Sequence, residues 1–426
     1  MKSSTIKIGA ILLFFFANNI GLPSALQYTT LLSPLLFFYT FGDFWKSYVV
    51  GVVIYLILFI LHYMGGVTAW PEYFRSSALH FTVLIICVAF FKTLKKDPEI
   101  LYKAFDNAVA INFVLTLLAV ILLLSGNQSL MWDSATRSGA FANLPRLKML
   151  TYEPSYYSTL MAPIFLYFFV RWTENTRGSN FFPLCLIVLS LCLSLSVGVI
   201  FALFFSIVIS NILALKRRTI IIFSVSGIFL FLAVVFFVTF DPSSPLVLRI
   251  INILAGTDVS GNARLVDSWT IAVQILQKHH SYLTGVGWGQ IKIVGHDIIG
   301  SFYNYSDNVD YNTHYSDSGP MQAPTYDIPN FTCELLATNG ILGVAAYLIA
   351  QIYLYRATNV RRSIYRKYIF WFIFIYQFTG SYSTSVVHYA LLVIAFYKPM
   401  DLYFVKYRLP HKSKKGYRLN YDLSTV

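Results

Sequence analysis

Charged residues are scarce in this chain of 426 residues, and their scarcity excludes an ordinary soluble domain. Asp, Glu, Lys and Arg make up 12% of the sequence, hydrophobic residues make up 57%, and the mean hydropathy is +0.62. A soluble domain uses about 25% charged residues to cover its surface. Lipid is therefore the expected solvent for most of the chain, and the composition predicts an all-α polytopic membrane protein.

Cysteine is also rare, which excludes a small fold held together by disulfides. The four cysteines all lie in or beside apolar runs, so they form neither a disulfide framework nor a metal cluster. The histidines of the longest polar segment follow no zinc-binding spacing. We therefore expect no metal ion and no other cofactor.

Long apolar runs are abundant and predict about twelve transmembrane helices. The runs lie at 6–22, 25–41, 48–64, 77–94, 108–125, 155–171, 181–196, 197–215, 219–239, 331–355, 368–381 and 383–398. The stretch 181–215 is too long for one span, and we expect it to be divided near Ser194, Ser196 and Gly198. The predicted order is helices 1–9 within 1–240, a large outer loop at 241–330, helices 10–12 within 331–398, and a basic cytoplasmic tail at 399–426.

Basic residues test this topology. The chain has 32 Lys and Arg against 19 Asp and Glu, a net charge of +13. With twelve spans and both termini in the cytoplasm, most of the Lys and Arg residues fall on the cytoplasmic side, as they do in other membrane proteins. If 181–215 were one helix, the basic clusters at 356–367 and 398–418 would move outward. The basic excess thus reflects topology and attraction to anionic lipids, and no nucleic-acid partner is expected.

Two predicted outer segments are large enough to build a site, 126–154 and 241–330. In the longer one, 262–278 has the pattern of an amphipathic helix. Its predicted apolar face consists of Leu265, Trp269, Ala272, Val273 and Leu276. A glycine-rich turn, GVGWG at 285–289, follows, and the tyrosine-rich stretch 301–327 is expected to be irregular.

The shorter outer segment carries Arg137, Arg146 and Glu153. Two guanidinium groups beside a carboxylate suit a site that binds pyrophosphate and holds a general base. The alternative is that the arginines contact lipid headgroups while Glu153 caps the helix that begins at Pro154.

The longer segment carries Arg249, Arg264 and Trp269 in a predominantly acidic background. A bound phosphate would explain the isolated arginines, whereas an ordinary pair with Asp267 at helical spacing would explain Arg264 alone. Trp269 and the loop tyrosines are candidates for stacking on sugar rings, or for an interfacial aromatic belt.

The end of the loop carries further candidates, His314, Asn330 and Glu334. His314 suits a general base near neutral pH, although an exposed loop histidine is the simpler interpretation. Glu334 lies one turn inside an apolar helix, where a carboxylate indicates a wet cavity or a partner. Gly340 and Gly343, which follow, are interpreted as sites of close helix packing.

In their order and placement, these features resemble the bacterial O-antigen polymerase and O-antigen ligase family of membrane glycosyltransferases. The resemblance rests on an Arg-x6-Glu-Pro-Ser segment at 146–155, an Asn-Ala-Arg-Leu-x3-Trp pattern at 262–269, the GVGWG turn, and an Asn-x3-Glu-x5-Gly-x2-Gly pattern at 330–343.

The resemblance implies transfer of a polyprenyl-pyrophosphate-linked oligosaccharide to a sugar hydroxyl at the outer leaflet of the bacterial inner membrane. Outer arginines would hold the pyrophosphate, and a carboxylate or histidine would deprotonate the acceptor. Arg146, Glu153 and Arg264 fall on matching positions, and Arg137 matches less closely. The implied partners are the lipid-linked oligosaccharide, membrane lipids and a chain-length regulator.

One position departs from the family pattern. Ligase-like members tend to have histidine directly before the asparagine at the end of the loop, and this chain has Pro329. The departure favours a polymerase in which Glu153, Glu334 or His314 is the base. An O-antigen ligase remains the alternative within the same class, and a flippase for lipid-linked saccharides is the alternative from another class.

Overall fold

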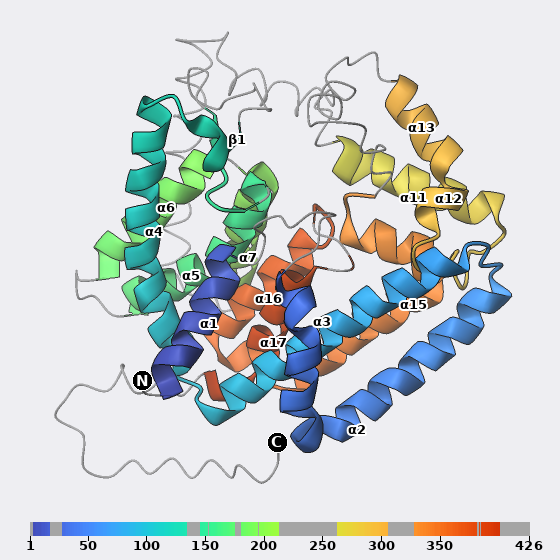
Figure 1. The fold of residues 1–426 in the computed structure, drawn as a ribbon, viewed down its shortest axis with the longest axis horizontal. Helices are drawn as coiled ribbons and strands as arrows, with labels where there is room; N and C mark the ends of the chain where they lie inside the picture. Colours follow the sequence, from blue (N-terminus) through green and yellow to red (C-terminus); the bar gives the residue numbers. More distant parts are fainter. Residues whose placement is uncertain are drawn as a thin grey trace.

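The computed structural model of the chain is mostly helical (Figure 1). It describes residues 3–17, 28–133, 145–174, 180–212, 262–305 and 328–400, except 152, 195, 381, 382 and 384. The helices of the first half are α1 (Ser3–Ala17), α2 (Tyr28–Met64), α3 (Trp70–Lys96), α4 (Ile100–Leu124), α5 (Pro154–Glu174), α6 (Phe181–Ser194) and α7 (Val197–Ile212). Those of the second half are α11 (Ser268–Lys278), α12 (Ile291–Val294), α13 (His296–Tyr305), α15 (Phe331–Ala357), α16 (Ile364–Tyr376) and α17 (Val386–Phe396).

A few short elements complete the described structure. Strands β1 (Trp132–Asp133) and β2 (Arg146–Leu147) pair antiparallel, with Trp132 opposite Leu147. The first outer segment therefore folds back on itself before α5 begins. One turn of π-helix, η4 (Ala263–Asp267), leads directly into α11.

The helices are those of a multi-pass membrane protein. Four described helices are long and apolar enough to cross a bilayer, namely α2 over Thr30–Met64, α3, α4 and α15, and shorter apolar helices accompany them. Every predicted apolar run in the described residues lies largely within a helix, and the run 219–239 falls outside them. The count of twelve spans stays a prediction.

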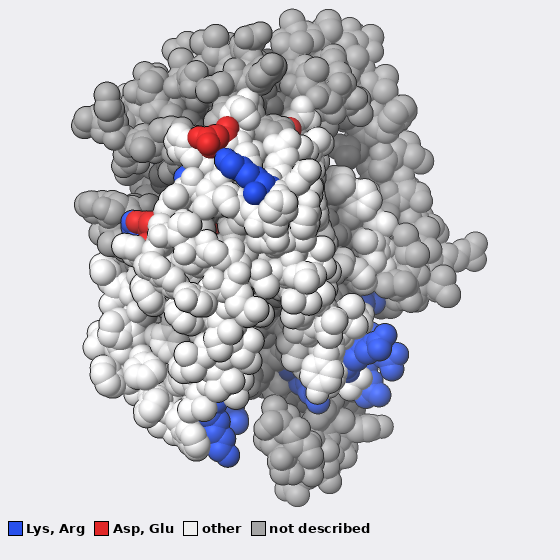
Figure 2. Space-filling model, turned by 90° about the vertical axis from the view of Figure 1, so that its right-hand side faces the viewer, with Lys and Arg blue, Asp and Glu red and all other residues white. Residues whose placement is uncertain are grey.

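A broad apolar surface agrees with this environment. Figure 2 shows charged side chains toward the upper and lower parts of one face, with a wide uncharged area of described residues between them. On α2, large apolar side chains point outward, and Leu35 and Phe38 are 68% and 77% exposed. In water such a surface would be unfavourable, whereas in a bilayer it contacts lipid tails.

Two breaks fall where the apolar pattern predicts them. The stretch 181–215 contains two helices, because α6 ends at Ser194 and α7 begins at Val197. The predicted runs 25–41 and 48–64 are joined in α2, which kinks at Phe44, with φ of −127° and ψ of 24°. A sharp kink therefore replaces the loop expected between these two runs.

The two segments predicted to lie outside are found at one end of the bundle. β1 and helices α11 to α13 lie at the upper end in Figure 1, opposite the start of α1. Helix α5 descends from this end into the core, where it packs against α6, α16 and α7. Its buried Tyr157 hydroxyl donates to Oδ1 of Asn112 on α4, so the polar group is satisfied inside the apolar core.

The amphipathic helix of the longer segment is present, but its predicted face was partly wrong. Leu265 and Val273 are 52% and 46% exposed, so they lie outside the packed face. The buried residues of α11 are Ser268, Ile271, Ala272, Ile275 and Leu276. The prediction of an irregular stretch at 301–327 was also wrong at its start, because 301–305 form the last turns of α13.

A backbone crossing joins the outer segment to α15. At Gly340, α15 breaks from helical geometry, and the chain between α11 and α12 passes through the break. The N–H groups of Val286 and Gly287 donate to the carbonyls of Ala337 and Thr338, both at 2.9 Å. In return, the N–H groups of residues 341 and 342 donate to the carbonyls of residues 282 and 283, at 2.9 and 3.2 Å. These four bonds replace the two helical bonds that α15 loses at the break, so its backbone stays satisfied.

Two glycines make this crossing possible. Gly285 and Gly340 have φ of +72° and +64°, and a Cβ atom on either would lie 2.3 Å from backbone atoms of the other segment. Only glycine tolerates both the left-handed backbone and such a close approach. Gly340 thus permits a helix break, rather than the helix packing expected from the sequence.

Gly340→Ala is expected to lower stability by about 1–3 kcal/mol, because the added methyl group collides with the carbonyl of Leu283 and strains the backbone. The thermal midpoint of the purified protein in detergent, followed by tryptophan fluorescence, measures this loss. Gly42→Ala is the matched control, since a Cβ there meets nothing within 4 Å. Equal midpoints for the two variants would contradict the prediction.

Candidate functional site

A small cavity unites residues from both outer segments. It is lined by Glu153, Ser155, Tyr156, Thr159, Arg264, Pro329, Tyr376, Ser385 and Val387. The space accessible to the centre of a water molecule is about 20 Å³, room for one or two waters. The cavity therefore brings Glu153 and Arg264, predicted from separate motifs, to one place.

Glu153 lies at the point where the chain enters α5. Its carbonyl accepts from the N–H of Tyr157, so it occupies the N-cap position, and its carboxylate accepts from the hydroxyl of Ser155. The hydroxyl of Thr151 also holds the Glu153 carbonyl, at 2.9 Å. Glu153 therefore lies both at the N-cap position of α5 and on the wall of the cavity.

Arg264 enters the cavity from the π-helical turn η4. A π-turn is wider than an α-turn, is rare in proteins, and often occurs at functional sites. The carbonyl of Arg264 accepts a hydrogen bond of 2.7 Å from Nδ2 of Asn330. Partial burial raises the pKa of the neighbouring Asp267 carboxyl, so desolvation rather than a nearby cation dominates that group.

Three helix N-termini converge on the cavity. Glu153 precedes α5, Pro329 lies two residues before α15, and Ser385 precedes α17. The positive ends of the helix dipoles add to the charge of Arg264. The arrangement favours an anion beside the guanidinium group.

Asn330 holds the backbone beside the cavity in place. Its Oδ1 accepts from the N–H groups of Thr332 and Cys333, and its Nδ2 donates to the carbonyls of Arg264 and Phe378, both at 2.7 Å. Both ends of the amide are thus engaged with the protein. In this structure Asn330 caps α15 and positions Arg264, and its predicted contact with substrate stays a prediction.

Glu334 lies one turn into α15, beside the cavity and not among its lining residues. Its two carboxylate oxygens accept from the backbone N–H and the hydroxyl of Ser383, at 2.7 and 2.8 Å. It also interacts electrostatically with Tyr156, which lines the cavity and interacts in the same way with Glu153 and Arg264. Ser383 is therefore one partner of this carboxylate.

Other predicted residues lie at a distance from the cavity wall or outside the described residues. Nε of Arg146 donates to the carbonyl of Ser194 at the end of α6, at 3.2 Å. Trp269 packs against the apolar cluster formed by α11, α12, α13 and α15. Arg137, Arg249 and His314 lie outside the described residues, and their roles stay predictions.

Several cavity residues had no signal in the sequence. Tyr156, Thr159, Tyr376 and Ser385 sit among apolar residues of predicted spans, and the Thr159 hydroxyl donates to the Tyr376 hydroxyl at 3.1 Å. Tyr156 follows the Glu-Pro-Ser motif directly, so its position in the first turn of α5 was the one available clue. Among the described residues, no group of three His, Cys, Asp or Glu side chains could hold a metal ion.

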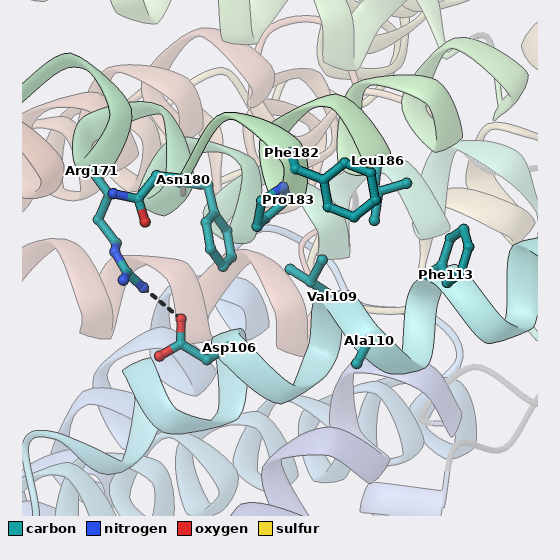
Figure 3. A pocket seen from close by; sticks show the side chains of 10 residues that line it. Asp106, Val109, Ala110, Phe113, Arg171, Asn180, Phe182, Pro183 and Leu186 are labelled. Carbon is teal, nitrogen blue, oxygen red and sulfur yellow. Dashed lines mark hydrogen bonds and ion pairs between the residues drawn. The ribbon is translucent and has the colours of Figure 1, made fainter. Parts of the chain in front are cut away.

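A second, larger cavity of about 450 Å³ lies between α4, α5 and α6 (Figure 3). Its lining is apolar apart from Asn180 and the ion pair of Asp106 with Arg171, at 2.6 Å. None of the residues predicted for the site lines it. The predicted residues Glu153 and Arg264 line the smaller cavity.

Asn330→Asp is expected to lower stability by about 1–3 kcal/mol, because a carboxylate keeps the cap of α15 but cannot donate to the carbonyls of Arg264 and Phe378. Thermal unfolding of the purified protein measures the loss. The matched control is Asn127→Asp, at an exposed turn. If both substitutions have the same small effect, the contacts of Asn330 with Arg264 and Phe378 do not stabilise the protein.

Comparison with known proteins finds a family match over part of the chain. Residues 182–348 match a family model described as O-antigen ligase. No curated protein matches the chain. The matched part includes Arg264, Asn330 and Glu334, while Glu153 precedes it. Residues 182–348 are therefore similar to O-antigen ligase, and this match supports the family that the order of the motifs predicted.

Proposed function

We propose that the protein is a polysaccharide polymerase of the bacterial inner membrane, with both termini in the cytoplasm. It transfers a growing glycan from a polyprenyl-pyrophosphate carrier to the sugar hydroxyl of a second lipid-linked unit at the outer leaflet. The observation that carries the proposal is the meeting of Glu153 and Arg264 in one cavity, although 111 positions separate them in the sequence. The match to O-antigen ligase supports the class of reaction.

The cavity supplies the two functions that this transfer needs. Arg264 and the helix N-termini stabilise the negative charge that develops on the departing pyrophosphate. Glu153 accepts the proton of the acceptor hydroxyl as its oxygen bonds to the anomeric carbon and the bond to pyrophosphate breaks. The carrier leaves as polyprenyl pyrophosphate, and the proton remains on Glu153 until it passes to water.

Substrate binding requires the cavity to open. Room for one or two waters cannot hold a sugar ring, so the turn that carries Arg264 and the start of α5 must separate before the reaction. Helix α5 is packed on several sides by other helices. Helix α11 is packed as well, against α15, η4 and α13.

A ligase, which transfers finished glycan to a lipid core, uses the same chemistry with a different acceptor. The description of the matched family fits it at least as well as a polymerase. The position that tends to be histidine in ligase-like members is Pro329, which lines the cavity here. In this chain a proline thus stands at the cavity wall where ligase-like members tend to have an imidazole, and this difference favours the polymerase.

Arg264→Ala is expected to lower glycan polymerisation about 10²–10³-fold, because the charge opposite the leaving group is lost. Glu153→Gln is expected to lower it about 10²–10⁴-fold, because the amide cannot accept the proton. The assay combines purified protein with a lipid-pyrophosphate oligosaccharide and follows chain length. Arg75→Ala, on an exposed part of α3, is the matched control and should retain activity.

The same assay separates the alternatives. If both site variants produced glycan chains of wild-type length, this cavity would not be the site. Transfer only to a lipid core, without chain growth, would identify a ligase. Movement of the substrate across the bilayer without a new glycosidic bond would identify a flippase.

A further inference from the structure

The larger cavity, between α4, α5 and α6, lies away from the proposed site of glycan transfer. Its volume of about 450 Å³ is in the range of small-molecule sites, about 300–1,000 Å³. Glu153 of the smaller cavity precedes the first residue of α5, whereas Arg171 of the larger one lies in its last turn. A helix rises about 27 Å over the 18 residues between them. On the predicted topology, the larger cavity is therefore on the cytoplasmic side.

This cavity is polar at one end and apolar along the rest of its wall (Figure 3). Asp106, Arg171 and Asn180 lie together at the polar end. The apolar part of the wall consists of Val109, Ala110, Phe113, Phe168, Phe182, Pro183 and Leu186. Such a division matches an amphipathic molecule, which has a polar head and a hydrocarbon tail.

The apolar part of the cavity opens onto the lipid-facing surface. Two of its lining residues, Phe113 of α4 and Phe182 of α6, are 39% and 66% exposed. Their exposed rings belong to the broad apolar surface that contacts lipid tails. A lipid can therefore enter the cavity directly from the bilayer.

Asn180 at the polar end has an amide without a protein partner. The residue is only 5% exposed, and within the described part of the chain its side chain makes no hydrogen bond. Buried amides are normally hydrogen-bonded, because an unpaired one loses its bonds to water. The amide therefore indicates a ligand with polar groups at this end of the cavity.

Asp106 has one carboxylate oxygen available to a ligand as well. Its Oδ1 accepts from Nη1 of Arg171 at 2.6 Å and from the hydroxyl of Tyr167 at 3.4 Å. Among the residues that the structure describes, none donates to Oδ2. A cationic N–H group is the donor that a carboxylate oxygen binds most strongly.

We propose that this cavity binds one phospholipid whose headgroup carries a primary ammonium, that is, a phosphatidylethanolamine. The lipid phosphate accepts from the amide of Asn180 and lies near the positive charge of Arg171, while the ammonium donates to Oδ2 of Asp106. An acyl chain fills the apolar part. A choline headgroup has no N–H to donate, and a glycerol headgroup has no cation.

The polyprenyl-pyrophosphate carrier is a poorer occupant. It would react at the outer leaflet, whereas the polar end of this cavity lies toward the opposite side on the predicted topology. Its headgroup also lacks an ammonium for the Asp106 carboxylate. The lipid site is therefore separate from the proposed function and does not rest on it.

Native mass spectrometry of the purified, delipidated protein measures binding. The probes are three phospholipids with identical acyl chains and ethanolamine, choline or glycerol headgroups. We expect one ethanolamine lipid per chain, bound about 10- to 100-fold more tightly than the choline lipid, because choline loses a hydrogen bond to a charged group.

Two substitutions separate the contacts at the polar end. Asp106→Asn should remove the preference for ethanolamine over choline, because the ammonium loses its ionised partner. Asn180→Leu should weaken all three lipids by a similar factor, because each of them has the phosphate. Glu99→Gln, at an exposed carboxylate that pairs with Lys103, is the matched control and should keep the preference.

A third substitution tests the apolar part of the cavity. Ala110→Trp fills the space of the acyl chain and should abolish binding of all three lipids. Val114→Trp is the matched control, because Val114 lies one turn further along α4, is 62% exposed and does not line the cavity. Equal thermal midpoints of these two variants show that the loss of lipid is not a loss of fold.

Equal binding of the ethanolamine and choline lipids to the wild-type protein would overturn the proposal. Full retention of lipid by Ala110→Trp would overturn it too, as would displacement of the phospholipid by a polyprenyl phosphate. A dimer that Ala110→Trp dissociates would make a second copy of the chain the occupant instead. No glycan transfer is measured, so each result is independent of the proposed polymerase activity.

Discussion

Four backbone hydrogen bonds, formed where the outer segment passes through the break in α15, hold the site together. They let a segment of irregular backbone enter an apolar helical bundle without unpaired polar groups. Helix α11 packs against α15 beside this crossing, and η4 carries Arg264 from the start of α11 to the cavity. The same break separates the first turns of α15, which bear Asn330 and Glu334, from the rest of the helix. The position of the arginine thus depends on two glycines far from it in the chain.

This packing also sets the positions of the charged groups around the cavity. The cavity gathers a guanidinium group and helix N-termini, which favour an anion, around one carboxylate at the start of α5. A second carboxylate, that of Glu334, lies outside the cavity lining. It accepts a hydrogen bond from the hydroxyl of Ser383, which also contacts His80. Both groups are glutamates in similar positions near helix starts, and the difference between them comes from their neighbours.

Hydrophobic length predicted the helices well, because apolar runs have one stable conformation in lipid. The packed face of the outer helix was less predictable. A regular period of 3.6 residues placed Leu265 with Trp269, but the π-turn at 263–267 adds width and rotates the residues before α11 away from that face. Glu153 and Arg264 were paired through the family resemblance. The contact of Ser383 with His80 had no local signal, because 303 positions separate them and only tertiary packing brings them together.

The crossing also bears on how the molecule assembles. Residues 282–287 have no hydrogen-bond partners at the break until α15 has been synthesised and has taken its place in the bundle. Docking of the outer segment is thus a late tertiary step, and it closes a contact between parts of the chain made at different times. A fragment cut out as 241–330 would lose these partners, and the backbone groups of residues 282–287 that bond to α15 would be left unsatisfied. The crossing therefore links the folding of residues 282–287 to that of α15.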